Sequence, residues 1–263
     1  KAAHLEIADA DDKAAKEASR DYIFISRSDS TLRGHYPLET RLLKECYERN
    51  TGVKLDGEVL CPFFKEGGRY TIGNVHYVKY GDELVPAHET EFAKDKTFGY
   101  TAENLPDYVE EKTAGEYKAK DVISISLENI RSMDFDKIES QLMAAENFNK
   151  IVVNAIDYSD IKVFAVALFR AMNAGKMFMF RTAAALVKVM GGVPDIPLLT
   201  RSDMIVNETE NGGIIVVGSH TAKTTSQLEC LKEITDIEFI ELDANLVSDE
   251  ESFANEVDRC LAL

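Results

Sequence analysis

Short apolar segments alternate with helix-like segments along most of the chain, and this alternation limits the fold more than any other feature. The strand candidates are YIFIS (22–26), GEVLCPF (57–63), DVISIS (121–126), KIVVNA (150–155), KMFMF (176–180) and GGIIVVGS (212–219). Continuous apolar runs of this length are typical of strands buried on both faces. Helical periodicity is found over residues 5–19, 37–49, 135–146 and 158–172. We therefore expect an α/β fold with a mostly parallel sheet, flanked by helices and joined by right-handed crossovers.

Two segments interrupt this alternation. Residues 64–100 combine aromatic and β-branched residues with Gly, Asn and Asp, which predicts a β-hairpin excursion from the sheet. Residues 191–213 are rich in Pro, Gly and Asn, and we interpret them as the connection between two domains. The expected domains are residues 1–205 and residues 206–263.

The segment after this connection has the pattern of the first strands and helices of a second α/β domain. Strand candidate 212–219 is followed by a helix candidate (224–234), a strand candidate (237–242) and a helix candidate (249–261). A segment of this size is marginal for an independent core, so we expect it to belong to something larger or to pack on the first domain. The chain starts at Lys1 rather than Met, which also indicates a part of a longer protein.

Composition excludes several classes of protein. The formal net charge is −16, and without a dense basic patch such a surface repels nucleic acid. No apolar run reaches the roughly 18 residues that a membrane-spanning helix needs, and the N-terminal segment lacks a signal-peptide core. We expect a cytoplasmic protein that binds neither nucleic acid nor membrane, with a homo-oligomer left open. A few arginines can still attract a small anion locally, because charge pairs are stronger in a partly buried site than in water.

The cysteine pattern and the known short motifs give no sign of a metal site. The four cysteines (Cys46, Cys61, Cys230 and Cys260) form no CxxC pair, which is typical of reduced core thiols. The segment HETEF lacks the second histidine of the HExxH zinc motif, and neither GxSxG nor GxGxxG occurs. We therefore expect no metal bound directly by this chain.

Polar clusters follow several of the strand candidates. Parallel sheets bind their ligands at the carboxyl ends of the strands, so these clusters are candidate sites. In SRSDSTLRGH, Arg27 and Asp29 share a face if the strand continues, although a capped turn with an Asp29–Arg33 salt bridge explains the segment equally well. In FRTAAALV, Arg181 leaves a strand and Thr182 precedes a helix, which favours an anion site or a plain N-cap.

Three further segments carry weaker signals. Arg69 in KEGGRYT is a candidate anion clamp or part of an ordinary turn. Glu89 and Glu91 beside His88 are candidates to bind a metal, a sugar hydroxyl or nothing. The segment VVGSHTAKTTSQLE has the order of a phosphate-binding turn, a strand followed by a Gly-Ser turn and a helix, but it lacks the Walker A spacing.

These segments together resemble the four-carbon acid sugar kinase family, whose members phosphorylate threonate, erythronate or 3-oxo-tetronate with ATP. The resemblance covers about residues 22–235 and rests on the blocks SRSDSTLRGHYPLE, PFFKEGGRYTIGNVHYV, ETEFAKD, FRTAAALVK and GGIIVVGSHTAKTTSQLE, in this order. It implies that the first domain binds the sugar acid and that the second binds the nucleotide with Mg²⁺. Family members also have an N-terminal DD-x-TG turn and C-terminal glycine-rich segments, which are missing here.

The resemblance implies roles for individual residues. The residues implied in or near the acid-sugar pocket are Asp29, Arg33, Arg69, Glu89, Glu91 and Arg181, and Arg27 is added for its place beside Asp29. Asp29 is a candidate to orient or deprotonate the attacking hydroxyl, and the aspartates of the missing N-terminal turn are equal or better candidates. Ser219 is the candidate to contact ATP. Two other classes stay open, a non-catalytic binding module for a small hydroxy acid and a structural protein with a basic partner.

Overall fold

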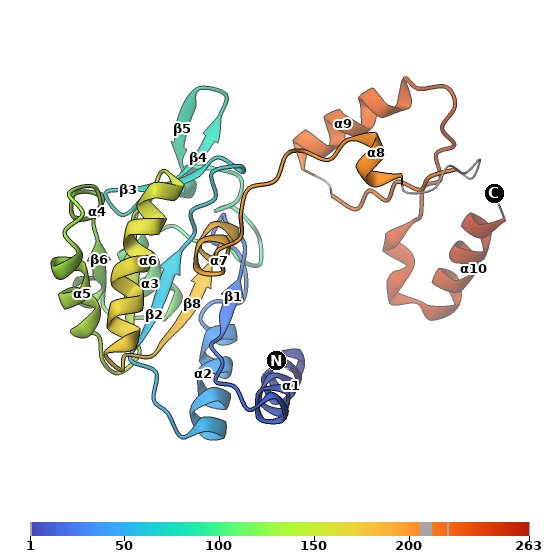
Figure 1. Ribbon diagram of the computed structural model, residues 1–263. Coiled ribbons are helices and arrows are strands. Elements are labelled where there is room, and N and C mark those ends of the chain that lie inside the picture. Colours follow the sequence, from blue (N-terminus) through green and yellow to red (C-terminus); the bar gives the residue numbers. More distant parts are fainter. Residues whose placement is uncertain (1, 206–211, 220, 263) are drawn as a thin grey trace. The chain divides into compact units, whose positions relative to one another are not determined.

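Five of the expected strands pair side by side in one sheet, and every pairing is parallel (Figure 1). In the computed structural model, which describes residues 2–205, 212–219 and 221–262, the spatial order is β1-β8-β2-β7-β6. The strands are β1 (Ile25–Arg27), β2 (Gly57–Cys61), β6 (Ile123–Ile125), β7 (Asn149–Val153) and β8 (Phe178–Thr182). The expected α/β class is therefore confirmed.

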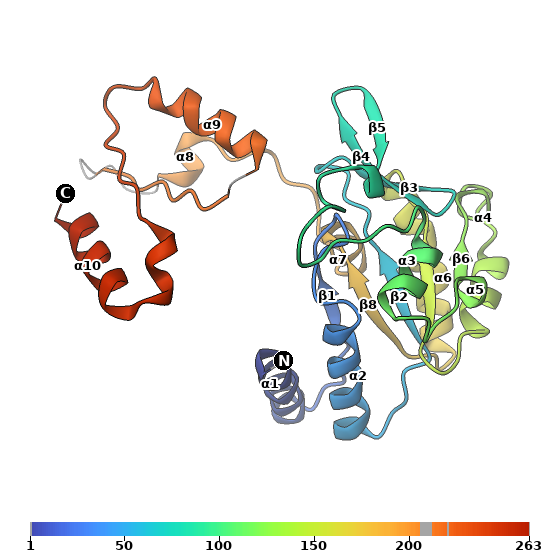
Figure 2. The ribbon, with the colours of Figure 1, turned by 180° about the vertical axis from the view of Figure 1, so that it is seen from behind.

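Helices cover both faces of this sheet (Figures 1 and 2). One face packs against α4 (Leu127–Arg131), α5 (Phe135–Met143), α6 (Tyr158–Asn173) and α7 (Ala184–Met190). The other packs against α2 (Leu38–Thr51) and α3 (Leu105–Lys112), while α1 (Ala2–Ala18) lies against α2. Because side chains alternate along a strand, Val59 faces the α4–α7 side and its neighbour Leu60 faces the α2–α3 side.

The two faces differ in polarity. The α4–α7 face is built from apolar side chains, whereas the α2–α3 face carries the buried charged residues Glu58, Lys150 and Arg181. Glu58 and Lys150 are partners in the register of β2 and β7, and their side chains form an ion pair at 0% and 1% exposure. Burial lowers the pKa of Lys150, and the Glu58 carboxylate opposes that shift.

The expected hairpin excursion is present as a small antiparallel sheet of β3 (Arg69–Ile72), β4 (Val75–Tyr80) and β5 (Glu83–Pro86). The excursion is fastened to the carboxyl end of β7. Thr71 and Ala155 exchange two backbone hydrogen bonds, of 3.0 and 3.1 Å. The Asn154 side chain accepts from the Asn74 backbone N–H at 2.7 Å and donates to its side-chain oxygen at 2.8 Å. These bonds bring β3 to the edge of the main sheet where ligands are expected.

The chain divides into two compact units, Lys1–Ile196 and Pro197–Leu263, and the second contains α8 (Arg201–Met204), α9 (Ala222–Lys232) and α10 (Glu250–Leu261). The segments 212–219 and 237–242, expected as strands, form no strand among the described residues. A strand needs a hydrogen-bonded neighbour and a covered apolar face, but Ile214 is 89% exposed and Val216 is 85% exposed. The domain boundary at 205/206 stays a prediction, and residue 206 lies outside the described residues.

A membrane crossing requires a long helix of mainly apolar residues. Across residues 2–205, 212–219 and 221–262, none of the helices meets both conditions.

Candidate functional site

A polar loop, residues 28–37, leaves the carboxyl end of β1 and leads into α2. In this loop Asp29 accepts hydrogen bonds from the Thr31 hydroxyl and from Arg33 Nε, the latter at 2.9 Å. Burial acts to raise the pKa of Asp29, but the bonds from Thr31 and Arg33 outweigh it and hold the pKa below its usual value. Asp29 is therefore a carboxylate at neutral pH, and the salt bridge to Arg33 considered from the sequence is present.

The hairpin brings Arg69 next to this loop, and one aromatic ring joins the two arginines. The guanidinium carbon of Arg33 lies 5.0 Å from the centre of the Phe92 ring, and that of Arg69 lies 5.3 Å from it. Both distances are within the range of cation–π attraction. The sequence reasoning missed Phe92, although its position one residue after Glu91 in the block ETEFAKD could have drawn attention to an aromatic side chain in an acidic loop.

The two arginines differ in how far their charges are compensated. Arg33 faces two carboxylates, with Asp29 at 2.9 Å and Asp95 at 3.8 Å. Arg69 donates from Nη1 to the Gly67 carbonyl, its buried Nε has no hydrogen-bond partner, and among the described residues no carboxylate forms an ion pair with it. Burial lowers the pKa of Arg69. A partly buried guanidinium with an unused donor is a ready receptor for an anion.

The turn that presents Arg69 is held from both sides. Lys65 forms an ion pair with Asp157 at 2.5 Å, and the Tyr158 hydroxyl donates to the Glu66 carboxylate at 2.8 Å. Between these anchors and β3, Gly68 adopts a left-handed conformation with φ of +70°, and a Cβ added there would come within 2.9 Å of Lys79 Cβ. The two anchors and the glycine together fix where the Arg69 side chain begins.

Gly68→Ala is expected to destabilise the protein by roughly 1–3 kcal/mol, because the new methyl group meets Lys79 in addition to the backbone strain. Gly73→Ala is the matched control, since Gly73 is also left-handed, with φ of +57°, but has nothing within 4 Å of the added Cβ. Urea unfolding of both variants measures the difference. Equal losses for the two variants would show that the contact with Lys79 is not tight.

Glu91 is hydrogen-bonded to a tyrosine that lies near Arg69. The Tyr80 hydroxyl donates to Glu91 Oε2 at 2.7 Å, and burial together with Glu91 raises the pKa of Tyr80 to about 12. Glu91 is also close enough to Arg69 to oppose the fall in its pKa. Glu89 is 60% exposed beside His88, and Arg27 is exposed at the end of β1. Within the described part of the chain, no hydrogen bond or ion pair joins either of these two residues to Arg69.

Arg181 supports the loop from inside the protein. It is 4% exposed, its Nε donates to Glu39 at 3.2 Å, and its Nη2 donates to the Arg33 carbonyl at 3.3 Å. The guanidinium also lies 4.7 Å from the centre of the Tyr36 ring. Arg181 therefore contacts the loop that carries Arg33, and its hydrogen bonds go to groups of the protein. Its contact with a ligand stays a prediction.

A buried histidine ties the hairpin to the loop. His76 Nε2 lies 2.8 Å from the Ser30 carbonyl oxygen, and Nδ1 lies 3.0 Å from the Thr71 hydroxyl oxygen. Because a carbonyl can only accept, the hydrogen belongs on Nε2, and Nδ1 accepts from Thr71. Burial lowers the pKa of His76 to about 4. The ring is therefore neutral at physiological pH.

This histidine gives the free energy of unfolding a pH dependence. Unfolded His76 takes up a proton below about pH 6.5, whereas the folded form stays neutral down to about pH 4, so protons favour the unfolded chain. The contribution of His76 alone should lower the free energy of unfolding by roughly 3 kcal/mol as the pH falls from about 6.5 to about 4. Denaturant unfolding at several pH values should show this slope in the wild type and in His35→Gln, an exposed control. His76→Gln should lack it, and an unchanged slope in that variant would contradict the assignment.

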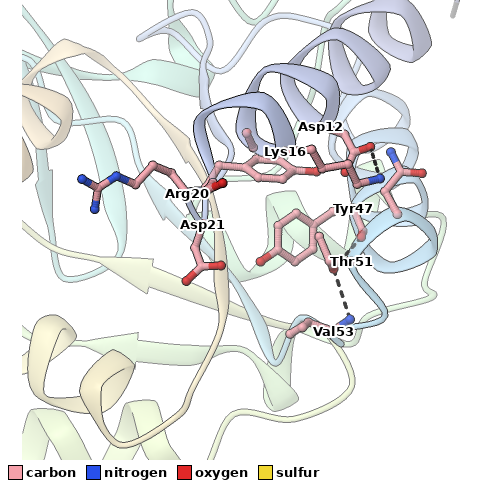
Figure 3. Close-up of a pocket in the computed structure, with 11 residues that line it drawn as sticks. Asp12, Lys16, Arg20, Asp21, Tyr47, Thr51 and Val53 are labelled. Atoms are coloured by element: carbon pink, nitrogen blue, oxygen red, sulfur yellow. Dashed lines mark hydrogen bonds and ion pairs between the residues drawn. The ribbon is translucent and has the colours of Figure 1, made fainter.

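A cavity lies elsewhere, at the opposite edge of the sheet. It measures about 700 Å³ and is bordered by the C-terminal ends of α1 and α2, near Asp12, Lys16, Tyr47 and Thr51 (Figure 3). The Lys16 ammonium is already bound to Asp12 at 2.7 Å. We favour the Arg33–Arg69 cluster as the functional site, because parallel sheets bind ligands at the carboxyl ends of their strands and because Arg69 has an unused donor.

In the second unit, three hydroxyls gather at the start of α9. The Thr224 hydroxyl donates to Ser219 Oγ at 3.0 Å, and Thr221 lies 3.3 Å from Ser219 and 3.1 Å from Thr224. Thr221 is also the N-cap of α9. Ser219 therefore lies beside a helix N-terminus, as expected, while its contact with ATP stays a prediction.

The first unit is an α/β domain in which Arg33 and Arg69 lie together at the carboxyl edge of a parallel sheet. The model of a family described as the sugar-binding N-terminal domain matches residues 1–190. The chain belongs to this family, which forms the N-terminal domain of four-carbon acid sugar kinases. The family expected from the sequence is thereby confirmed.

Solved structures with a similar chain path are distant in sequence. A Haemophilus influenzae protein is 16% identical with a TM-score of 0.48, and the match covers 93% of this chain and 54% of that one. A Salmonella typhimurium protein, provisionally described as a tRNA synthase, is 10% identical with a TM-score of 0.47, covering 67% of this chain and 38% of that one. The chain thus spans about half or less of these proteins. None of the curated proteins matches significantly.

Proposed function

We propose that this chain contains the acid-binding domain of an ATP-dependent four-carbon acid sugar kinase, and that Arg69 and Arg33 hold the carboxylate of the sugar acid. The observation that carries the proposal is the pair of guanidinium groups on the Phe92 ring, one of which has a buried donor without a partner. In a member of a sugar-binding family, such a pair fits a ligand that has both a carboxylate and hydroxyls.

The neighbouring carboxylates suit the rest of the ligand. Asp29 is ionised, and it accepts hydrogen bonds on one oxygen from Thr31 and Arg33. A carboxylate can accept at both oxygens, so Asp29 has capacity left for a hydroxyl of the sugar acid. Its lowered pKa makes it a better group for orienting the attacking hydroxyl than for removing its proton.

The nucleotide part of the proposal rests on the second unit. The hydroxyls of Ser219, Thr221 and Thr224 at the start of α9 fit phosphate oxygens, because hydroxyls and free backbone N–H groups both donate there. When bound, ATP supplies the phosphoryl group and Mg²⁺ neutralises its oxygens. Within residues 2–205, 212–219 and 221–262, no three His, Cys, Asp or Glu side chains are grouped to hold a metal, so the proposal assigns no residue to Mg²⁺.

Calorimetric titration of the chain tests the binding step. We expect heat with at least one of threonate, erythronate and 3-oxo-tetronate, and none with threitol, which lacks the carboxylate, or with butyrate, which lacks the hydroxyls. Silence with all three acids would overturn the proposed acid site. Equal binding of threitol would show that the arginines do not select the carboxylate.

The kinase step is tested with a protein that also contains the nucleotide-binding part implied by the family resemblance. Incubation with ATP, Mg²⁺ and the acid that binds should release ADP in proportion to the acid added, as measured by a coupled assay. Binding without ADP release would overturn the kinase assignment and favour a non-catalytic binding module for small hydroxy acids.

A further inference from the structure

Four successive carbonyl groups of the polar loop, residues 28–37, each accept a hydrogen bond from a buried side chain. The Ser30 carbonyl accepts from His76 at 2.8 Å, and the next carbonyl, that of Thr31, accepts from Tyr100 at 3.1 Å. The Leu32 carbonyl accepts from the Tyr108 hydroxyl at 2.7 Å. The fourth bond is the one from Arg181 Nη2 to the Arg33 carbonyl, at 3.3 Å.

The four donors come from separate parts of the first unit. His76 lies on β4, Tyr100 lies in the segment before α3, Tyr108 lies on α3, and Arg181 lies on β8. Their exposures are 2%, 5%, 0% and 4% in that order. Burial raises the pKa of Tyr108 to about 12, so its hydroxyl keeps the hydrogen that it donates.

Such bonds are unusual because a surface loop normally exposes its backbone to water. Leu32 has a φ of +70°, a left-handed conformation that a leucine rarely adopts without outside support. With the carbonyls of residues 30–33 bound inward, the segment between Asp29 and Arg33 is held in one conformation. The ligand-facing groups at its two ends are therefore placed before any ligand arrives.

We infer that His76, Tyr100, Tyr108 and Arg181 are positioning residues that hold the loop in its binding conformation. This inference rests on the proposed function for the identity of the ligand. Its structural part, the immobility of the loop, can be measured in the ligand-free protein. Its functional part is that a ligand binds without first having to order the loop, which preserves affinity.

Tyr108→Phe and Tyr100→Phe test the inference, because each removes one hydroxyl and keeps the packed ring. Amide hydrogen exchange in the ligand-free chain should become about five- to tenfold faster for residues 29–34, the factor that corresponds to one lost hydrogen bond. Exchange in β2 and β7 should stay unchanged. The double variant should show a larger increase in the loop than either single variant.

Tyr47→Phe is the matched control, since Tyr47 is a buried tyrosine of α2 in a different apolar cluster. It should leave exchange in the loop unchanged. Equal exchange of the loop in Tyr108→Phe, Tyr100→Phe and wild type would overturn the inference, and so would faster exchange throughout the sheet, because that would indicate general destabilisation.

The ligand measurement separates this inference from the proposed function. For whichever acid binds the wild type, Tyr108→Phe should weaken binding about fivefold, and Tyr47→Phe should not. A mobile loop with unchanged affinity would overturn the positioning role while leaving the proposed function in place. Failure of the wild type to bind any of the three acids would overturn the proposed function, whereas the exchange result would still decide whether the loop is held.

Discussion

Arg69→Gln is expected to lower the affinity for the four-carbon acid about 100-fold, which corresponds to about 3 kcal/mol for a lost charge-assisted interaction. The reason is the difference between the two arginines, since Arg33 already faces Asp29 and Asp95 while Arg69 keeps a buried donor without a partner. The melting temperature should change by no more than a few degrees, because the variant breaks no ion pair that Arg69 makes with a described residue. Calorimetry and thermal unfolding measure the two effects.

Arg49→Gln provides the matched control for this substitution. Arg49 lies on α2, where its guanidinium is 3.3 Å from Asp9 and its side chain is 59% exposed. The same chemical change there should leave the affinity unchanged. An Arg69→Gln variant that binds as tightly as the wild type would place the carboxylate elsewhere, and Arg33→Gln would then be the next variant to measure.

Lys150→Met is expected to cost about 3–5 kcal/mol of unfolding free energy, the usual loss when one partner of a buried ion pair is removed. Methionine keeps most of the side-chain volume between Phe148 and Tyr117, whose ring centres lie 3.8 and 4.2 Å from the ammonium. What remains is the Glu58 carboxylate at 0% exposure, and one of its oxygens has no hydrogen-bond partner even in the wild type. Urea unfolding followed by circular dichroism and tyrosine fluorescence measures the loss.

The double variant Glu58→Gln/Lys150→Met should be more stable than Lys150→Met alone by about 2 kcal/mol, because it removes the uncompensated charge. Glutamine can still accept the hydrogen bond that Tyr36 donates to Glu58 at 3.4 Å. Lys44→Met, which breaks a partly exposed pair with Glu48, should cost no more than about 1 kcal/mol. Equal stability of the single and double variants would show that an uncompensated charge at Glu58 is not the cause of the loss in Lys150→Met.

The main sheet could be predicted from the sequence because each central strand is a short, mostly apolar run, and such a run is typical of a strand buried on both faces. The same signal failed at residues 212–219, where an equally apolar run forms no strand. An apolar sequence makes a segment able to form a buried strand. Whether it forms one depends on a neighbouring strand with which it can pair. The order of the strands was also not predictable, because it depends on contacts between residues far apart in the sequence.

The site could be predicted only in part. Asp29 and Arg33 were expected just after a strand, and they lie in the loop that follows β1. Arg69 was grouped with them only through the family resemblance, and it lies at the start of β3, against the same Phe92 ring as Arg33. The contact of these residues with a ligand stays a prediction. Which of the arginines has an unused donor could not be read from the sequence, since this depends on the distances to Asp95 and Glu39. Phe92 and His76 were missed because they carry no charge at neutral pH and their functions lie in what they contact.

The unequal polarity of the two sheet faces separates side chains that only pack from side chains that also support the polar loop 28–37. Substitutions among the aliphatic side chains beneath α4–α7 alter packing alone, so homologous or engineered variants can diverge there at little risk to ligand recognition. On the other face the strands carry Arg181, which donates a hydrogen bond to the polar loop 28–37 directly, and the Glu58–Lys150 pair, which contacts that loop through Tyr36. A stabilised version of this protein is best sought by redesigning the first side and preserving the second.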